Sequence, residues 1–149
     1  MRRCAARRDV FLLLCLAATA APAQNRVLEL DGTGAHVELP AAVFDSLREA
    51  TVEAWVRWDD WVYFSQWFAY DTGQTWRGIG INHFDGDATL QAFVYTGEQD
   101  HVSVARRGVN LPPGQWCHTA AVFGPQGLRL YVNGALVARD EFTGSFARS

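Results

Sequence analysis

Residues 128–139 read Leu-Arg-Leu-Tyr-Val-Asn-Gly-Ala-Leu-Val-Ala-Arg, two alternating apolar runs joined by Asn133 and Gly134. Alternation with a period of two is typical of a β-strand that buries one face. A type I′ hairpin turn needs positive φ at both central residues, which Asn and Gly tolerate best. The stretch therefore predicts a tight antiparallel β-hairpin.

The same period of two recurs upstream in almost every segment. Residues 51–58 are the clearest strand, because Thr51, Glu53, Trp55 and Arg57 fall on one side and the aliphatic residues with Trp58 on the other. Residues 41–50 hold the one plausible helical turn. About ten short strands, separated by Gly, Pro and Asp turns, predict a one-domain β-sandwich or barrel. Besides 51–58 and the hairpin, these strands are expected at 27–30, 35–39, 62–70, 76–84, 89–95, 101–105 and 116–123.

The N-terminus has the pattern of a secretory signal peptide. Four arginines within residues 2–8 precede the short apolar run 10–18, and Ala21-Pro22-Ala23 supplies a small-residue cleavage site. The apolar run is shorter than the roughly 20 residues of a transmembrane helix. We therefore expect a signal peptide over 1–23, cleavage after Ala23, no transmembrane segment in the mature chain, and a secreted or periplasmic protein.

Charge and cysteine content narrow the classes of partner. Removal of residues 1–23 leaves nine arginines against fifteen acidic residues, a net charge of −6, and the chain has no lysine. An acidic domain without a basic run is a poor candidate for binding nucleic acid. Cys117 is the one cysteine outside the signal peptide, so no internal disulfide is expected. It lies in an apolar strand, which predicts a buried, inert thiol.

Four segments resemble the laminin-G-like, concanavalin A-like family, and in particular its bacterial form. They are the opening stretch 28–40, residues 50–56 (Ala-Thr-Val-Glu-Ala-Trp-Val), residues 115–120 (Gln-Trp-Cys-His-Thr-Ala) and residues 128–134 (Leu-Arg-Leu-Tyr-Val-Asn-Gly). Their order and spacing cover nearly all of residues 26–140. The resemblance implies an all-β fold, a two-sheet antiparallel jelly-roll sandwich, for residues 24–149.

The resemblance also implies one more strand after the last hairpin, which the residues up to Ser149 do not match. We therefore expect a domain that lacks its final strand. An uncovered sheet edge invites pairing with another chain. Self-association through an open sheet edge is the expected consequence.

A catalytic role is disfavoured by the pattern of acidic residues. Retaining glycosidases need two carboxylates about 5 Å apart, and the Glu-x-Asp-x-Glu cluster of the family's laminarinase-type branch is missing from this sequence. Asp85 and Asp87 have suitable spacing but sit in an expected turn. His118 is expected to be a structural residue of a core strand, and His36, His83 and His101 to be solvated. We predict no enzymatic activity and no catalytic residue.

No organic cofactor is indicated, but relatives often hold a structural calcium ion. Calcium takes six to eight oxygen ligands, and the resemblance would make Asp31 one of them. Asp31 also stands in an Asp-Gly-Thr-Gly stretch, where turn formation is the favoured explanation. It is a weak metal candidate.

Aromatic residues are concentrated between residues 55 and 76, which contain five of the six tryptophans. Strand alternation cannot place them all in one core. Core packing accounts for Trp55, Phe64 and Phe68. Tryptophan and tyrosine beside carboxylates suit sugar rings or peptides, because the rings stack and the acids accept hydrogen bonds. The candidate ligand-binding residues are Trp58, Asp59, Asp60, Trp61, Tyr63 and Trp76.

These features together favour an exported, non-catalytic recognition module that binds carbohydrate or another extracellular or envelope ligand. The alternative is a protein-interaction or sensor-input domain that forms the N-terminal part of a larger envelope or signalling protein. A glycoside hydrolase is a distant third.

Overall fold

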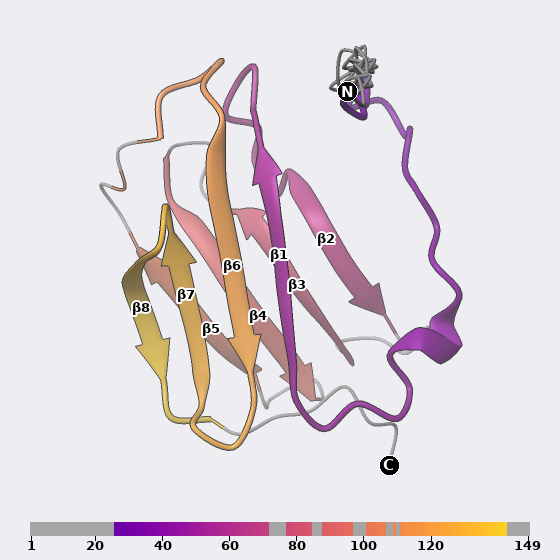
Figure 1. Cartoon of the computed structure of the whole chain (residues 1–149), viewed down its shortest axis with the longest axis vertical. Coiled ribbons are helices and arrows are strands. Elements are labelled where there is room, and N and C mark those ends of the chain that lie inside the picture. The colour runs from indigo at the N-terminus through magenta and orange to yellow at the C-terminus, as the bar shows by residue number, and fades with distance from the viewer. Residues whose placement is uncertain are drawn as a thin grey trace, which may run out of the picture.

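The computed structural model describes residues 26–71, 77–84, 88–96, 101–106, 109 and 111–142. Eight strands in these residues form two antiparallel four-stranded sheets (Figure 1). Sheet A has the order β1 (Ala50–Val56), β6 (Cys117–Phe123), β7 (Leu128–Val132) and β8 (Ala135–Asp140). Sheet B has the order β2 (Gln66–Asp71), β3 (Arg77–His83), β4 (Leu90–Thr96) and β5 (His101–Arg106). The predicted all-β, two-sheet sandwich is confirmed.

The hairpin of β7 and β8 forms at the predicted turn. Asn133 and Gly134 have φ values of 49° and 78°, and Val132 pairs with Ala135 across them. The Asn133 side chain accepts a hydrogen bond from the His118 backbone N–H at 2.9 Å, which ties the turn to β6. The turn chemistry that the sequence encodes therefore also anchors the hairpin to the neighbouring strand.

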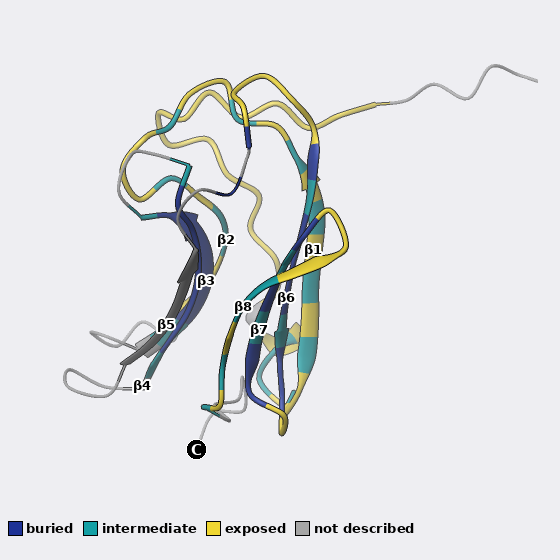
Figure 2. Cartoon of the chain, turned by 90° about the vertical axis from the view of Figure 1, so that its left-hand side faces the viewer, coloured by how far each residue is buried: buried dark blue, intermediate teal, exposed yellow. Residues whose placement is uncertain are grey.

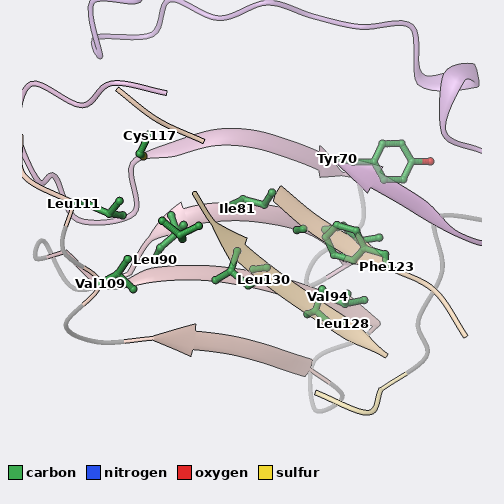
Figure 3. Close-up of a cluster of buried hydrophobic side chains, with 14 residues drawn as sticks. Tyr70, Ile81, Leu90, Val94, Val109, Leu111, Cys117, Phe123, Leu128 and Leu130 are labelled. Atoms are coloured by element: carbon green, nitrogen blue, oxygen red, sulfur yellow. The ribbon is translucent and has the colours of Figure 1, made fainter. Parts of the chain in front are cut away.

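The core lies between the inner faces of the two sheets (Figures 2 and 3). Strands β4 and β5 contact β7 and β8, so the sheets approach each other most closely along that side. The predicted alternation of β1 is confirmed, because Val52, Ala54 and Val56 turn inward while Thr51, Glu53 and Trp55 are exposed. The buried cluster comprises Tyr70, Ile79, Ile81, Leu90, Ala92, Val94, Val109, Leu111, Cys117, Ala121, Phe123, Leu128, Leu130 and Val132.

The predicted opening hairpin is wrong in its strands but right in its turn. Residues 27–39 form no strand, and Leu28, Leu30 and Val37 are exposed. The Asp31 carboxylate accepts hydrogen bonds from the backbone N–H groups of Thr33 (2.9 Å) and Ala35 (3.4 Å). A two-stranded ribbon is marginally stable by itself. Without pairing to either sheet, only the locally encoded turn forms, and the segment runs along the β2 side of the molecule (Figure 1).

The helical turn expected within 41–50 is present as a short 3₁₀ helix, η1 (Ala41–Val43). Its continuation places the Phe44 ring 5.3 Å from that of Tyr70 and 5.7 Å from that of Phe68. Asp45 accepts a hydrogen bond of 2.6 Å from the Tyr70 hydroxyl. This turn therefore packs against one end of β2.

The strand expected from residue 62 begins instead at Gln66. Residues 62–65 form a turn in which the Ser65 N–H donates to the Val62 carbonyl at 3.0 Å. Phe64 has a φ of 56°, a left-handed conformation that bulky residues rarely adopt. Apolar alternation alone could not reveal this turn, because its residues look like strand residues. No helix of the described residues is long and apolar enough to cross a membrane.

Candidate functional site

The connection between β1 and β2, residues 57–65, carries most of the predicted ligand-binding residues, and we call it the aromatic loop. The rings of Trp58 and Trp61 each lie 4.4 Å from the ring of His83, at the end of β3, and 6.0 Å from one another. Both indoles are half-buried and pack against the core. The structure therefore brings these two residues together, but their rings pack at the edge of the core and are not free to stack on a ligand.

His83 corrects the expectation that it is solvated, because its side chain is fully buried between these two indoles. Alternation along β3 places residues 79, 81 and 83 on the inner face, and Ile79 and Ile81 are core residues. The imidazole therefore fills the end of the core. Exposure of this histidine could not be judged from the sequence without the register of β3.

The acidic pair of the aromatic loop stays in solvent. Asp59 and Asp60 are exposed. Asp59 lies 3.6 Å from the Arg57 guanidinium, and the Asp60 carboxylate accepts a short bond of 2.7 Å from the Trp61 N–H. Asp60 therefore shapes the loop, while Asp59 presents a carboxylate beside the indoles.

The tip of the aromatic loop exposes two aromatic rings. Tyr63 is 63% exposed and Phe64 41% exposed. Their rings are 4.5 Å apart, and the Phe64 ring lies 5.4 Å from that of Phe84. Tyr63 is thus the predicted ligand-binding residue whose ring is most available to a partner. Trp76 lies outside the described residues.

The outer face of sheet B has a hollow that the sequence did not predict. Gly78 and Gly80 on β3 stand directly opposite Tyr95 and Phe93 on β4. A side-chain carbon at Gly80 would collide with the Phe93 ring. The two aromatic rings lie 4.8 Å apart and border an open volume of about 210 Å³, which we call the sheet B trough. It is lined by Gln66, Ala69, Tyr70, Asp71, Gly78, Ile79, Phe93 and Tyr95.

Carboxamides cross the sheet beside this trough. Gln66, Asn82 and Gln91 are register partners on β2, β3 and β4. Asn82 is 0% exposed, and neither its amide nitrogen nor its oxygen has a hydrogen-bond partner in the described part of the chain. Such a group costs free energy while its hydrogen bonds are unmade. Of the three carboxamides, Gln66 lines the trough, which thus combines aromatic walls with a polar group, as small-molecule sites commonly do.

The outer face of sheet A exposes two further tryptophans, which corrects the assignment of Trp55 to the core. Trp55 is 65% exposed, and its ring lies 5.5 Å from that of His118. Nearby, the Arg57 guanidinium lies 5.6 Å from the Trp116 ring. His118, expected to be a structural residue of a core strand, has a side chain that is 26% exposed, with Nε2 3.5 Å from a Glu53 carboxylate oxygen. Alternation within 51–57 already placed Trp55 on the polar side of β1, and that signal could have identified this surface.

Phe64 was likewise assigned to the core and is instead at the exposed loop tip, whereas Phe68 packs against the core as expected. The turn at 62–65 accounts for the difference, because it lifts Phe64 out of the strand.

Asp31, the expected calcium ligand, uses its carboxylate to hold the turn in which it lies. Its hydrogen bonds from Thr33 and Ala35 hold the pKa of the carboxyl below its usual value. Glu29, Asp31 and Asp59 line one hollow, but Arg57 lines it too. Among the described residues no three His, Cys, Asp or Glu side chains converge as metal ligands. These residues do not fit a calcium site, and calcium binding stays a prediction.

Cys117 is buried at the start of β6, as the sequence predicts. Burial raises the pKa of its thiol to about 11. The thiolate is the reactive form of cysteine, so this side chain serves as a core residue at neutral pH.

Comparison with known proteins agrees with this architecture. A search of the curated proteins finds no match to the chain. The model of a laminin G family described as the concanavalin A-like lectin/glucanases superfamily matches residues 31–149. That description joins ligand-binding proteins with glycan-cleaving enzymes. With its paired antiparallel sheets and this match over most of its length, the chain belongs to the concanavalin A-like lectin/glucanases superfamily.

Proposed function

We propose that this protein is an exported recognition module that binds a neutral carbohydrate polymer without cleaving it. The sheet B trough is the observation that carries the proposal. A pyranose ring has an apolar face and a rim of hydroxyls, so it needs an aromatic surface with amides or carboxylates beside it. Tyr95 borders the trough and Phe93 forms its wall, while Gln66 and Asp71 line it.

The aromatic loop extends this surface toward the end of β3. Phe84 follows Asn82 at the two-residue spacing of the outer face, and the Tyr63 and Phe64 rings contact Phe84. A polymer along β3 would therefore pass from the trough to the loop tip. In this arrangement Tyr63 is the loop residue that contacts ligand, whereas Trp58 and Trp61 hold the loop in place and Asp59 faces Arg57 on the sheet A side.

The arrangement of carboxylates supports the non-catalytic part of the proposal. Glycoside hydrolysis requires a pair of them on either side of the scissile bond. Within the described residues Asp71 is the one carboxylate that lines the trough. The missing Glu-x-Asp-x-Glu cluster supports the same conclusion. The secretory signal pattern at residues 1–23 and an inert thiol suit a protein that works outside the cytoplasm.

The test is calorimetric titration of the purified protein with neutral polymers: a β-glucan, a xylan and a galactomannan. We expect one of them to bind, and Tyr95→Ala to weaken that binding by about tenfold. Tyr131→Ala is the matched control, because Tyr131 is also a half-buried strand tyrosine but lies in sheet A. Equal effects of the two variants would contradict the proposal. New reducing ends in the same incubations would contradict its non-catalytic part.

A protein-interaction domain is the second candidate, and the position of β1, which has no partner strand on one side among the described residues, favours it. β1 ends sheet A, and such an edge presents unpaired backbone groups to other strands. Antiparallel pairing of two β1 strands centred on Glu53 would place the two Glu53 carboxylates opposite one another, which is destabilising. Self-association by this route should therefore be weak, and increase on Glu53→Gln substitution. Sedimentation equilibrium measures it, and an equally monomeric wild type and variant would exclude this route.

A further inference from the structure

Two arginines stand directly opposite one another on the outer face of sheet A. Thr51, Val122, Arg129 and Arg139 form one row of register partners across β1, β6, β7 and β8. Directly opposed side chains of antiparallel strands have β-carbons about 5 Å apart, and like charges there repel. Neither guanidinium forms an ion pair with any residue that the structure describes, although the chain as a whole is acidic.

Arg129 is the less exposed of the two arginines. Its side chain is half-buried, and its Nε group is shielded from water without a hydrogen-bond partner in the described residues. The same residue lines a hollow of about 380 Å³. Thr51 and Gln126 line this hollow with polar groups, Val122 with an apolar one, and Glu49 with a carboxylate. Arg129 therefore borders a space that a ligand can enter, although its Nε group is itself shielded from that space.

We propose that Arg129 and its cross-strand neighbour Arg139 bind the carboxylate of an acidic sugar residue whose ring occupies the hollow beside Arg129. A guanidinium matches a carboxylate in shape and donates two parallel hydrogen bonds to it. Glu49 balances the charge of Arg129 at the hollow, so the neighbouring Arg139 leaves one net positive charge, which suits a monoanionic carboxylate better than a dianionic phosphate. Such a ligand would relieve the repulsion between the two arginines.

A sugar acid fits this surface better than an acidic peptide. An extended peptide gains much of its affinity from hydrogen bonds to a free strand edge. Arg129 and Val122 lie on β7 and β6, the two central strands of sheet A, whose backbone groups already pair with neighbouring strands. A ligand bound there would therefore contact side chains and not a free strand edge. The Thr51 hydroxyl and the Gln126 amide supply partners for sugar hydroxyls.

The test titrates the purified protein with polygalacturonate, with its methyl ester, and with poly-L-glutamate at low ionic strength. We expect polygalacturonate alone to bind, and Arg129→Gln and Arg139→Gln each to weaken it by about tenfold. Glu49→Gln removes the opposing charge and should strengthen binding. Added NaCl should weaken it, because salt screens exposed charges.

Arg57→Gln is the matched control. It removes the same charge from the same face of sheet A, but Arg57 already has Asp59 as its partner. A loss of binding as large as that of Arg129→Gln would overturn the proposal, since it would show a general charge effect. Equal binding of the methyl ester would overturn carboxylate recognition, and equal binding of poly-L-glutamate would assign the site to peptides. Failure to bind any of the three would also reject it. The neutral polymers and Tyr95 test the trough separately.

Discussion

Phe64 provides the sharpest test of the aromatic loop. With a φ of 56° it occupies the left-handed region, where a residue with a β-carbon costs about 1–2 kcal/mol and glycine costs nothing. Elsewhere alanine is more stable than glycine by about 0.5–1 kcal/mol, since glycine loses more backbone freedom on folding. The difference makes Phe64→Gly more stable than Phe64→Ala by about 0.5–1 kcal/mol. This is the reverse of the usual order.

Both variants lose the packing of the ring. About three-fifths of the Phe64 surface is buried, and full burial of phenylalanine contributes about 1.5–3 kcal/mol. We therefore expect Phe64→Ala to lose about 1–2 kcal/mol and Phe64→Gly clearly less. The gap between them corresponds to roughly 2–4 °C in Tm. Urea and thermal unfolding of the purified variants measure both quantities.

Tyr63 is the internal control, because it lies at the same loop tip without a positive φ. Tyr63→Gly should be less stable than Tyr63→Ala, the opposite order to position 64. If Phe64→Ala proves as stable as Phe64→Gly, the turn at 62–65 is not as described. Phe64→Gly is also the better variant for binding tests, since it removes an exposed ring at little cost to folding. Trp61→Ala is unsuitable, because it removes packing against His83.

Three further outcomes follow from close contacts and burial. Gly80→Ala should displace the Phe93 ring, cost about 1–2 kcal/mol, and abolish neutral-polymer binding in the same titration; unchanged binding would remove Phe93 from the ligand surface. Gly127→Ala should cost about 3 kcal/mol in urea unfolding, because its φ is 91° and a β-carbon would strike the Asp140 carbonyl; a loss below 1 kcal/mol would contradict that contact. The Cys117 thiol should resist a thiol reagent at pH 8 until urea is added. Folding raises the pKa of this thiol from 9.0 to about 11, so its contribution to stability is complete below pH 9 and falls between pH 9 and 11. If the difference in unfolding free energy between the wild type and Cys117→Ala stays constant over that range, this account is wrong.

Sequence alone was sufficient wherever local chemistry determines the structure. Alternation in residues 51–58 predicted both the strand and the side of it that is buried. Asn133-Gly134 predicted a turn with two positive φ values, and Asp31 predicted a turn closed by its own carboxylate. These features depend on residues a few positions apart, so the printed sequence contains all the information they require. The family resemblance then supplied the two-sheet architecture.

Tertiary structure decided which aromatic and polar groups meet a ligand. His83 is buried because the position of β3 within its sheet sets which face its side chain takes. The opening strands do not pair, because a ribbon needs neighbours that residues 27–39 do not find. The sheet B trough requires Gly80 to stand opposite Phe93, and the arginine pair requires Arg129 opposite Arg139. Such pairings join separate strands, and no local pattern of the sequence specifies which residues they bring together.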